Sequence, residues 1–216
     1  TVLETTIPSQ HVKLETEGLL ESLTVQDPMP PLRIPKNELG FTTQFFWDSD
    51  IGKWIEGASY ALRHKRDATI EAQIDDIVDK YEAAQLPDGY LNLWYIGHEL
   101  DQRWTNLRDR HELYNCGHLL EGAIAYFQAT GKRKLLDVIE RYLDHIRERF
   151  GTGPGQQLGY PGHQEIELAL VKLYQLTGER KQLDLAVYFI NQRGAEPHYY
   201  DVEAHARGED PDDYLF

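Results

Sequence analysis

The sequence predicts an all-α protein built from consecutive helical hairpins, and three observations support this fold class. Apolar residues recur with the 3.6-residue period of a helix in successive segments of the chain. The motif at residues 130–137 returns in similar form at residues 177–184, each copy lying between two such segments. The second segment of a pair carries more charge than the first, as an outer ring of helices around an inner ring would. Together these patterns favour an α/α toroid or an open helical solenoid.

The first hairpin is predicted from apolar segments at residues 51–62 and 70–85, with a polar break between them. Asp50 or Ser49 is expected to cap the first of these helices, because short polar side chains satisfy the unpaired N–H groups of a first turn. The tripeptide Pro87-Asp88-Gly89 is a turn signature that ends the second helix.

The central helix is predicted from apolar spacings of three, four and seven between residues 113 and 127. Asp109 is expected to be its N-cap, with Glu112 three residues later completing a capping box. Gly131 provides the C-terminal stop, because glycine tolerates the left-handed conformation that ends helices. His111 is therefore expected in the first turn, where side chains reach past the end of the helix.

The remaining helices are predicted at residues 135–146, 164–177 and 182–192, with a loop rich in Gly and Pro at 151–162. About three helical hairpins are therefore visible. Three hairpins do not close a toroid, and open apolar faces at both ends would exceed the patch size that monomers tolerate. We therefore expect a missing C-terminal half or an oligomer partner to cover these ends.

The hairpins divide the chain into three parts. Residues 1–43 contain several prolines, including a Pro-Met-Pro-Pro segment, and are interpreted as a wrapping arm with a short helix near residues 12–23. Residues 44–194 form the helical-hairpin part. Residues 195–216 are acidic and aromatic without a clear period, which indicates a tail or a connection.

Composition excludes several classes of partner. The formal net charge of −14 argues against nucleic acid, because phosphate backbones attract clustered Lys and Arg. No apolar run approaches the roughly 20 residues that cross a bilayer, so no membrane contact is expected. The first residues show no signal-peptide pattern, and the expected location is the cytoplasm. Cys116 is the single cysteine, so the chain can form neither an internal disulfide nor a thiolate metal cage.

Acidic residues near the helix starts are the first candidates for a binding site. In a toroid, the loops that enter the inner helices converge on one mouth, and aromatic residues beside carboxylates and histidines suit a sugar. Asp48 and Asp50 lie at one such helix start, where a capping and helix-dipole role is the alternative. Asp88 lies in a Pro-Asp-Gly tripeptide, so it is either a turn residue or a site residue.

Histidines at two further helix starts are the second group of candidates. His111 and His163 are each either a substrate contact or a polar group at a helix end. His118 lies deeper in the central helix and is interpreted as a core histidine. Its spacing from His111 is not that of a zinc-binding His-Glu-x-x-His motif, so no metal site is predicted. Cys116 is interpreted as a small buried residue rather than a nucleophile.

The ordered motifs resemble those of a known family. They are Phe46-Trp47-Asp48-Ser49-Asp50, Asp88-Gly89-Tyr90-Leu91, His111-Glu112-Leu113-Tyr114 and Gly162-His163-Gln164-Glu165. As a set, they resemble the N-terminal part of the β-L-arabinofuranosidases, family 127 of the glycoside hydrolases. The resemblance implies an (α/α)6 barrel followed by β-sandwich domains, and retaining hydrolysis of terminal β-L-arabinofuranosides. In that family a zinc-bound cysteine is the nucleophile and a glutamate is the acid/base, both in the second half of the barrel.

The resemblance implies roles for residues of this chain. His111 and His163 are expected to hydrogen-bond arabinose hydroxyls, while Asp48, Asp50 and Asp88 match motif positions and are expected to bind substrate. No catalytic residue or metal ligand is expected here, and the isolated chain is expected to be inactive. Two alternatives remain open. One is a zinc-independent α/α-toroid hydrolase or sugar epimerase that uses Asp50 or Asp88, and the other is a non-catalytic sugar-binding helical module.

Overall fold

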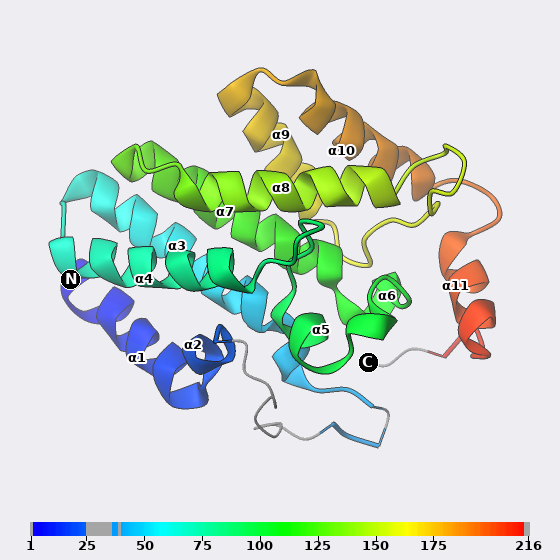
Figure 1. The fold of residues 1–216 in the computed structure, drawn as a ribbon, viewed down its shortest axis with the longest axis horizontal. Coiled ribbons are helices and arrows are strands. Elements are labelled where there is room, and N and C mark those ends of the chain that lie inside the picture. Colours follow the sequence, from blue (N-terminus) through cyan, green and yellow to red (C-terminus); the bar gives the residue numbers. More distant parts are fainter. Residues whose placement is uncertain (1, 25–35, 39, 214–216) are drawn as a thin grey trace.

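The computed structural model describes residues 2–24, 36–38 and 40–213 of the chain (Figure 1). The predicted Pro-Met-Pro-Pro segment, residues 28–31, lies outside the described residues. Within the described ranges the elements are helices joined by loops, and no strand is assigned apart from one isolated bridge. None of the described helices combines the length and the hydrophobicity that a bilayer-spanning segment needs.

The all-α class and the predicted hairpins are confirmed. The α-helices are α1 (Ile7–Glu17), α2 (Leu19–Ser22), α3 (Trp47–His64), α4 (Ala68–Ala84), α5 (Leu93–His98), α6 (Leu107–Arg110), α7 (Glu112–Thr130), α8 (Lys134–Arg149), α9 (Ile166–Thr177), α10 (Arg180–Gln192) and α11 (Tyr199–Arg207). A π-helical turn, η1 (Val2–Thr6), and two 3-10 turns, η2 (Thr43–Phe46) and η3 (Leu100–Gln102), accompany them. The three hairpins are α3–α4, α7–α8 and α9–α10.

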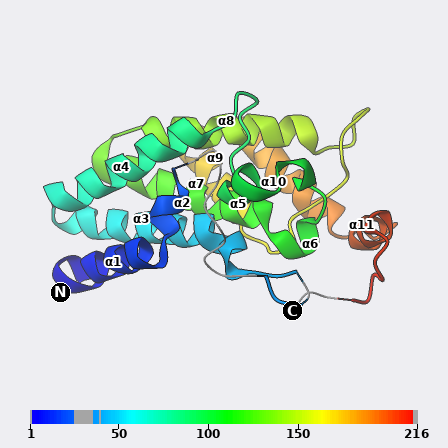
Figure 2. The same ribbon diagram turned by 60° about the horizontal axis from the view of Figure 1, so that its bottom comes forward.

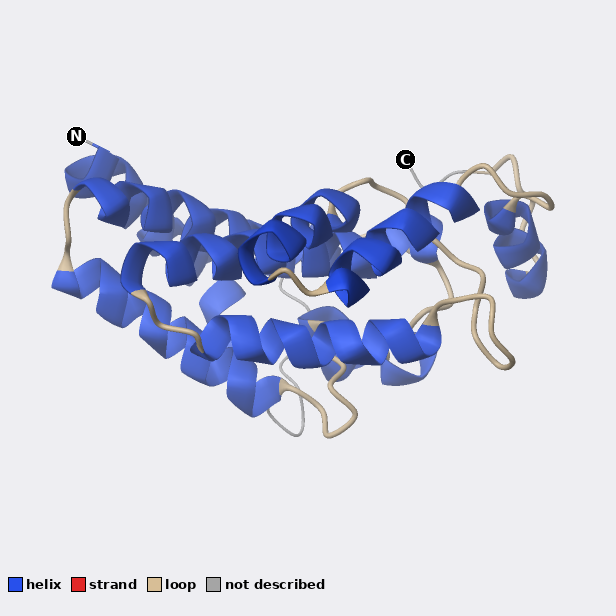
Figure 3. Ribbon diagram, turned by 90° about the horizontal axis from the view of Figure 1, so that it is seen from above, coloured by secondary structure: helices blue, strands red, loops and turns tan. Residues whose placement is uncertain are grey.

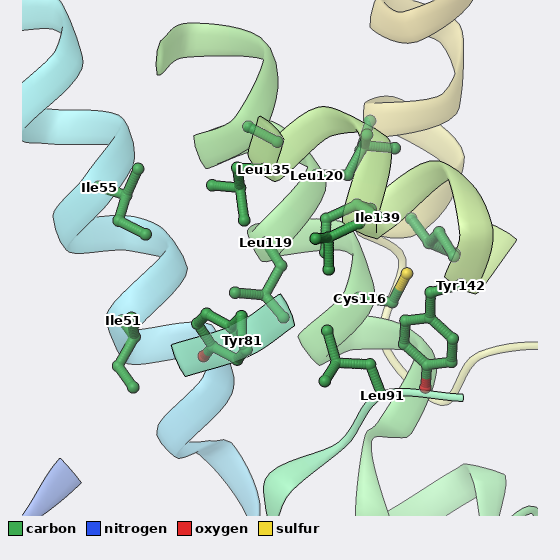
Figure 4. Close-up of a cluster of buried hydrophobic side chains, with 14 of the residues drawn as sticks. Ile51, Ile55, Tyr81, Leu91, Cys116, Leu119, Leu120, Leu135, Ile139 and Tyr142 are labelled. Atoms are coloured by element: carbon green, nitrogen blue, oxygen red, sulfur yellow. The ribbon is translucent and has the colours of Figure 1, made fainter. Parts of the chain in front are cut away.

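The hairpins pack side by side in two layers. Helix α3 packs along α7, and α7 packs along α9, so the first helices of the hairpins form a continuous inner layer. Helices α4 and α8 lie against each other over this layer (Figures 2 and 3). Between the layers, aliphatic and aromatic side chains of α3, α4, α7 and α8 form the core (Figure 4). This arrangement is consistent with an arc of an α/α toroid.

Glycines let the inner helices approach to backbone contact. A Cβ added to Gly122 of α7 would lie 2.8 Å from the Gly52 carbonyl oxygen of α3. A Cβ added to Gly52 would lie 2.7 Å from the His118 carbonyl oxygen. On the other side of α7, a Cβ on Gly117 would lie 2.7 Å from the Ile166 backbone nitrogen at the start of α9. Only glycine fits these crossings without a shift of backbone.

The predicted cap of α3 is wrong. The helix begins at Trp47, directly after η2, so Ser49 and Asp50 lie inside its first turn and neither caps it. The Ser49 hydroxyl instead donates a hydrogen bond to the Phe46 carbonyl oxygen at 2.7 Å. The 3-10 turn η2 leads directly into α3, so the helix begins without a capping side chain.

The predicted capping box of α7 is also wrong. Asp109 belongs to the separate helix α6, whose own cap is Asn106. His111, with a φ of 60°, separates the two helices in the left-handed conformation. Glu112 does not bond back to a cap, because Tyr90 and Trp104 donate hydrogen bonds to its two carboxylate oxygens at 2.6 and 2.8 Å. Tertiary partners have replaced the local motif.

The backbone contact between α3 and α7 predicts the effect of a single methyl group. Gly122→Ala should lower the free energy of unfolding by about 1–3 kcal/mol, because the added Cβ has no space beside the Gly52 carbonyl. Gly57→Ala is the matched control in α3, because the nearest atom to a Cβ at this position would be an Ile7 side-chain carbon at 3.9 Å. It should leave stability unchanged or raise it by about 0.5–1 kcal/mol. Urea unfolding measures both, and equal effects would contradict the packing argument.

Candidate functional site

A pocket of about 590 Å³ lies at the end of the inner layer where α6 meets α7. Its lining residues come from η2 and the segment before it, from α6, from the loop before α9, and from α11 and the residue before it. They are Phe41, Phe46, Arg108, Asp109, His111, Gly162, His163, His198 and Tyr200. Aromatic rings and convergent polar groups in one concave surface are the usual composition of a small-molecule site.

His111 is held at this pocket by its backbone. Its left-handed conformation turns the chain from α6 into α7, which is an uncommon conformation for a residue other than glycine. The ring Nδ1 is 2.8 Å from the Asp109 carbonyl oxygen. Because a carbonyl only accepts, Nδ1 carries the proton and Nε2 is the acceptor nitrogen of the neutral ring. Burial lowers the pKa of the imidazole, which favours this neutral form.

Asp109 and Arg108 stabilise the turn beneath His111. The Asp109 carboxylate is buried, and the Arg108 Nε and Nη2 atoms lie 3.0–3.1 Å from its oxygens. A buried carboxylate needs such a partner, because leaving it unpaired would cost several kcal/mol, on the order of 3–5. This ion pair therefore keeps α6 and the Asp109 carbonyl in place for the histidine.

His163 reaches the same pocket from the loop before α9. The Gly162 N–H donates to the Leu107 carbonyl oxygen of α6 at 3.2 Å. A Cβ on Gly162 would lie 2.1 Å from the Arg108 carbonyl oxygen, so only glycine allows this approach. The His111 and His163 ring centroids are 5.4 Å apart. Two histidines that lie 52 positions apart in the sequence thus form one surface.

The Tyr114 ring packs edge-on against both of these histidines. Its centroid lies 5.5 Å from that of His111 and 5.3 Å from that of His163. It also lies 4.5 Å from the ring of His118, one turn further along α7. The Lys53 ammonium of α3 donates to the Tyr114 hydroxyl at 3.0 Å. Tyr114 is part of the His-Glu-Leu-Tyr motif, but the sequence does not mark it as a site residue. Its contacts with three imidazole rings in the structure place it in the histidine cluster.

His118 belongs to this cluster but faces a carboxylate. Its Nδ1 lies 3.3 Å from the Glu165 Oε1 atom, and the ring is mostly buried. Burial is the main cause that lowers its pKa to about 4, and the nearby charges of Lys53 and His163 act in the same direction. His118 is not among the buried residues of the core, so its interpretation as a core histidine is not confirmed.

Asp48 lies away from the pocket, in the interior beneath α5. It is buried, and it accepts hydrogen bonds from the Tyr81 hydroxyl and the Leu93 N–H, both at 2.9 Å. Burial raises the pKa of this carboxyl to about 6, against the opposing effect of the two donors. In this position Asp48 connects the first turn of α3 to α4 and to the start of α5.

Asp50 and Asp88 lie on two other surfaces. Asp50 lines a groove of about 380 Å³ between α1 and α3, 3.8 Å from the Lys53 ammonium. Asp88 accepts hydrogen bonds from the Tyr90 N–H at 3.1 Å and from the Arg103 guanidinium at 2.9 Å. The structure therefore brings together His111 and His163, and it places Asp48, Asp50 and Asp88 in three separate environments.

Helix α11 and the residue before it contribute to the pocket, although the sequence did not predict this helix. The sequence predicts a tail or connection at residues 195–216, because they show no clear period. The structure forms α11 there, and Tyr200 and His198 line the pocket. The Tyr200 hydroxyl donates to the Pro161 carbonyl oxygen at 2.7 Å. The aromatic composition of this segment was the one signal that could have indicated it.

Comparison with known proteins connects this geometry to a family. The family profile described as "Beta-L-arabinofuranosidase, GH127 catalytic domain" matches residues 1–213. The chain is 41% identical over 175 residues to the non-reducing end β-L-arabinofuranosidase of Bifidobacterium longum subsp. longum. The chain belongs to glycoside hydrolase family 127. The resemblance expected from the ordered motifs is thereby confirmed.

Solved structures of GH127 enzymes share the fold. The GH127 β-L-arabinofuranosidase Ara127N-Se from Geobacillus stearothermophilus T6 superimposes with a TM-score of 0.88 at 45% identity, over 96% of this chain. The GH127 β-arabinofuranosidase BT3674 gives a TM-score of 0.80 at 38% identity, over 97% of this chain. This chain covers 33% of each of those proteins and 27% of the Bifidobacterium enzyme. It therefore spans about a third of the length of these GH127 relatives.

The buried Glu112 beside the site predicts a pH-dependent stability. Burial raises the pKa of its carboxyl to about 8, well above the unfolded value near 4.5. Between pH 4.5 and pH 8, the Glu112 carboxyl is protonated in the folded state and ionised in the unfolded state. The free energy of unfolding should therefore fall as pH rises from 4.5 to 8, by up to about 1.4 kcal/mol per pH unit.

Glu112→Gln tests this expectation, because glutamine resembles the protonated acid and does not titrate. Urea unfolding at several pH values should show a shallower fall for Glu112→Gln than for the natural protein. Glu148→Gln changes an exposed glutamate of α8 and should keep the natural slope. Identical slopes for all three proteins would show that Glu112 is ionised throughout this range.

Proposed function

We propose that this chain supplies the N-terminal hairpins of an (α/α)6 catalytic barrel that hydrolyses terminal β-L-arabinofuranosides with retention. We further propose that the pocket between α6 and the loop before α9 binds the arabinose. The observation that carries the proposal is the pair of imidazoles, His111 and His163, whose rings lie 5.4 Å apart at one pocket. The GH127 membership of the chain supports the reaction class.

The two imidazoles suit neighbouring sugar hydroxyls. The His111 Nδ1–H already pairs with the Asp109 carbonyl oxygen, which leaves Nε2 to accept a hydrogen bond from one hydroxyl, and the ring nitrogens of His163 can pair with a neighbouring hydroxyl. The aromatic rings of Phe46 and Tyr200 line the same pocket and suit the C–H surface of a sugar ring. Substrate binding by Asp48, Asp50 or Asp88 stays a prediction. It would involve groups outside this pocket, because none of the three is among the described residues that line it.

We propose that the zinc and the cysteine nucleophile expected of the family belong to parts of the enzyme outside this chain. Among the described residues, no three His, Cys, Asp or Glu side chains come together as a metal site would require. Cys116 does not fit the role either, because it is fully buried and burial raises the pKa of its thiol. A thiolate is the form that binds a metal and attacks a substrate.

We propose that further hairpins of the same catalytic barrel cover the open side of α9 and α10. Leu168 of α9 is 54% exposed and Ile190 of α10 is 58% exposed, with Val187 also exposed on α10. Val187 and Ile190 are three residues apart and therefore share a face of α10, and exposed apolar side chains on one helix face are typical of a packing surface. An oligomer partner is the alternative that would cover this side.

The cytoplasmic location also stays a prediction.

Substitution of the histidines tests the sugar site. In the complete gene product, His111→Ala and His163→Ala should each lower kcat/KM for an aryl β-L-arabinofuranoside by about 10- to 100-fold, because each removes a hydrogen bond of about 1–3 kcal/mol to the substrate. His64→Ala, at the exposed end of α3, is the matched control and should leave kcat/KM unchanged. Full activity of both pocket variants would exclude this pocket as the arabinose site.

Substitution of Cys116 tests the proposed place of the zinc chemistry. Cys116→Ala in the complete gene product should keep the zinc content and kcat of the natural protein. It should lower stability by about 1 kcal/mol, because it removes one buried sulfur atom. Metal analysis and steady-state kinetics give the result. Loss of zinc or of turnover in a variant that remains folded would assign the nucleophile to Cys116.

A further inference from the structure

We propose that α11 sets the separation of His111 and His163, with Tyr200 and Glu203 as positioning residues for the sugar site. This inference rests on the proposed function of the two histidines. Helix α11 lies outside the three hairpins, beside the ends of α6 and α10 (Figure 1). Its side chains make hydrogen bonds to both of the segments that carry the histidines.

Tyr200 holds the segment that carries His163. Its hydroxyl donates to the Pro161 carbonyl oxygen at 2.7 Å, and the Arg193 guanidinium donates to the same oxygen at 2.8 Å. The Tyr200 ring also packs against that of Tyr160, with centroids 4.5 Å apart. Pro161 is two residues before His163, so a carbonyl held by two donors restricts the approach of the histidine to the pocket.

Glu203 holds the segment that carries His111. Its carboxylate accepts the N–H groups of Leu107 and Arg108, the first residues of α6, at 2.7 and 3.3 Å. The Arg207 guanidinium lies 3.0 Å from Glu203 and also donates to the Thr105 carbonyl oxygen at 3.0 Å. The carboxylate is buried, so these partners are required. Because α6 has only four residues and His111 follows it directly, fixing its first turn also fixes the histidine.

The two segments also meet directly, through the Gly162 N–H at α6 and through the packing of Tyr114 against His163. These contacts lie at the histidines themselves, whereas α11 holds each segment a few residues before its histidine, at Pro161 and at Leu107. Tyr200 and Glu203, three residues apart, lie close together on one short helix, so α11 adds a rigid connection between the two segments. Geometry at this scale matters, since a displacement of about 1 Å in a substrate-positioning group can cost on the order of 100-fold in rate.

Two adjacent tyrosines of α11 provide a matched test in the complete gene product. Tyr200→Phe keeps the ring and removes the hydrogen bond to Pro161, and should raise KM for an aryl β-L-arabinofuranoside by about three- to tenfold. Tyr199→Phe removes a hydroxyl that is bonded to Gln157, away from the sugar pocket, and should leave KM unchanged. Glu203→Gln should raise KM in the same way as Tyr200→Phe. Equal KM values for Tyr200→Phe and Tyr199→Phe would overturn the inference.

A double-mutant cycle separates positioning from general stability. If Tyr200 acts through His163, Tyr200→Phe should have no further effect on KM in a His163→Ala background. A multiplicative effect in the double variant would mean that Tyr200 acts independently of the histidine, and would also overturn the inference.

Imidazole NMR tests the inference without reference to turnover. The side-chain nitrogen shifts of His111 and His163 should change in Tyr200→Phe and stay unchanged in Tyr199→Phe. Unchanged shifts in both variants would overturn the role of α11, whatever the activity. If the shifts respond but the natural protein and its His163→Ala variant show no difference on arabinofuranosides, the proposed function fails while the role of α11 stands.

Discussion

Backbone contact between neighbouring inner helices is the constraint on which the rest of the structure depends. Gly52 and Gly122 bring α3 against α7, and Gly117 brings α7 against the start of α9. Since Cβ atoms cannot fit at these crossings, the helices have little freedom to slide or to separate. The first residues of α7 and the loop before α9 are therefore brought to the same end of the layer, which is where the two pocket histidines lie.

The pocket itself depends on buried acidic side chains, one paired within its own short helix and one paired with residues from other segments. Arg108 satisfies the buried Asp109, while Tyr90 and Trp104 satisfy the buried Glu112 on the other side of His111. Each of these acidic side chains would be costly to bury without its hydrogen-bond partners. The left-handed His111 is thus placed between two anchored residues, which explains how an uncommon backbone conformation is maintained at a site for a ligand.

The fold and part of the site could be predicted from sequence, and the failures have a common physical cause. Helical period and the repeated motif predicted the hairpins, and the ordered motifs predicted the family and drew attention to His111 and His163. The caps expected at Asp50 and Asp109 did not form. Both predictions placed a helix start one turn away from where it forms: Asp109 lies inside the separate helix α6, which left-handed His111 divides from α7, and Asp50 lies inside α3, which begins directly after η2.

The sequence by itself determined the helices of the three hairpins, their pairing and their family, because these depend on local period and on motifs that are contiguous in the chain. The tertiary structure alone decided which polar residues share a pocket. It placed Asp48, Asp50 and Asp88 in three different environments, although all three lie in recognisable motifs. It also brought the aperiodic segment around Tyr200 to the histidines. Such placement depends on contacts between segments far apart in the chain, and no local pattern specifies them.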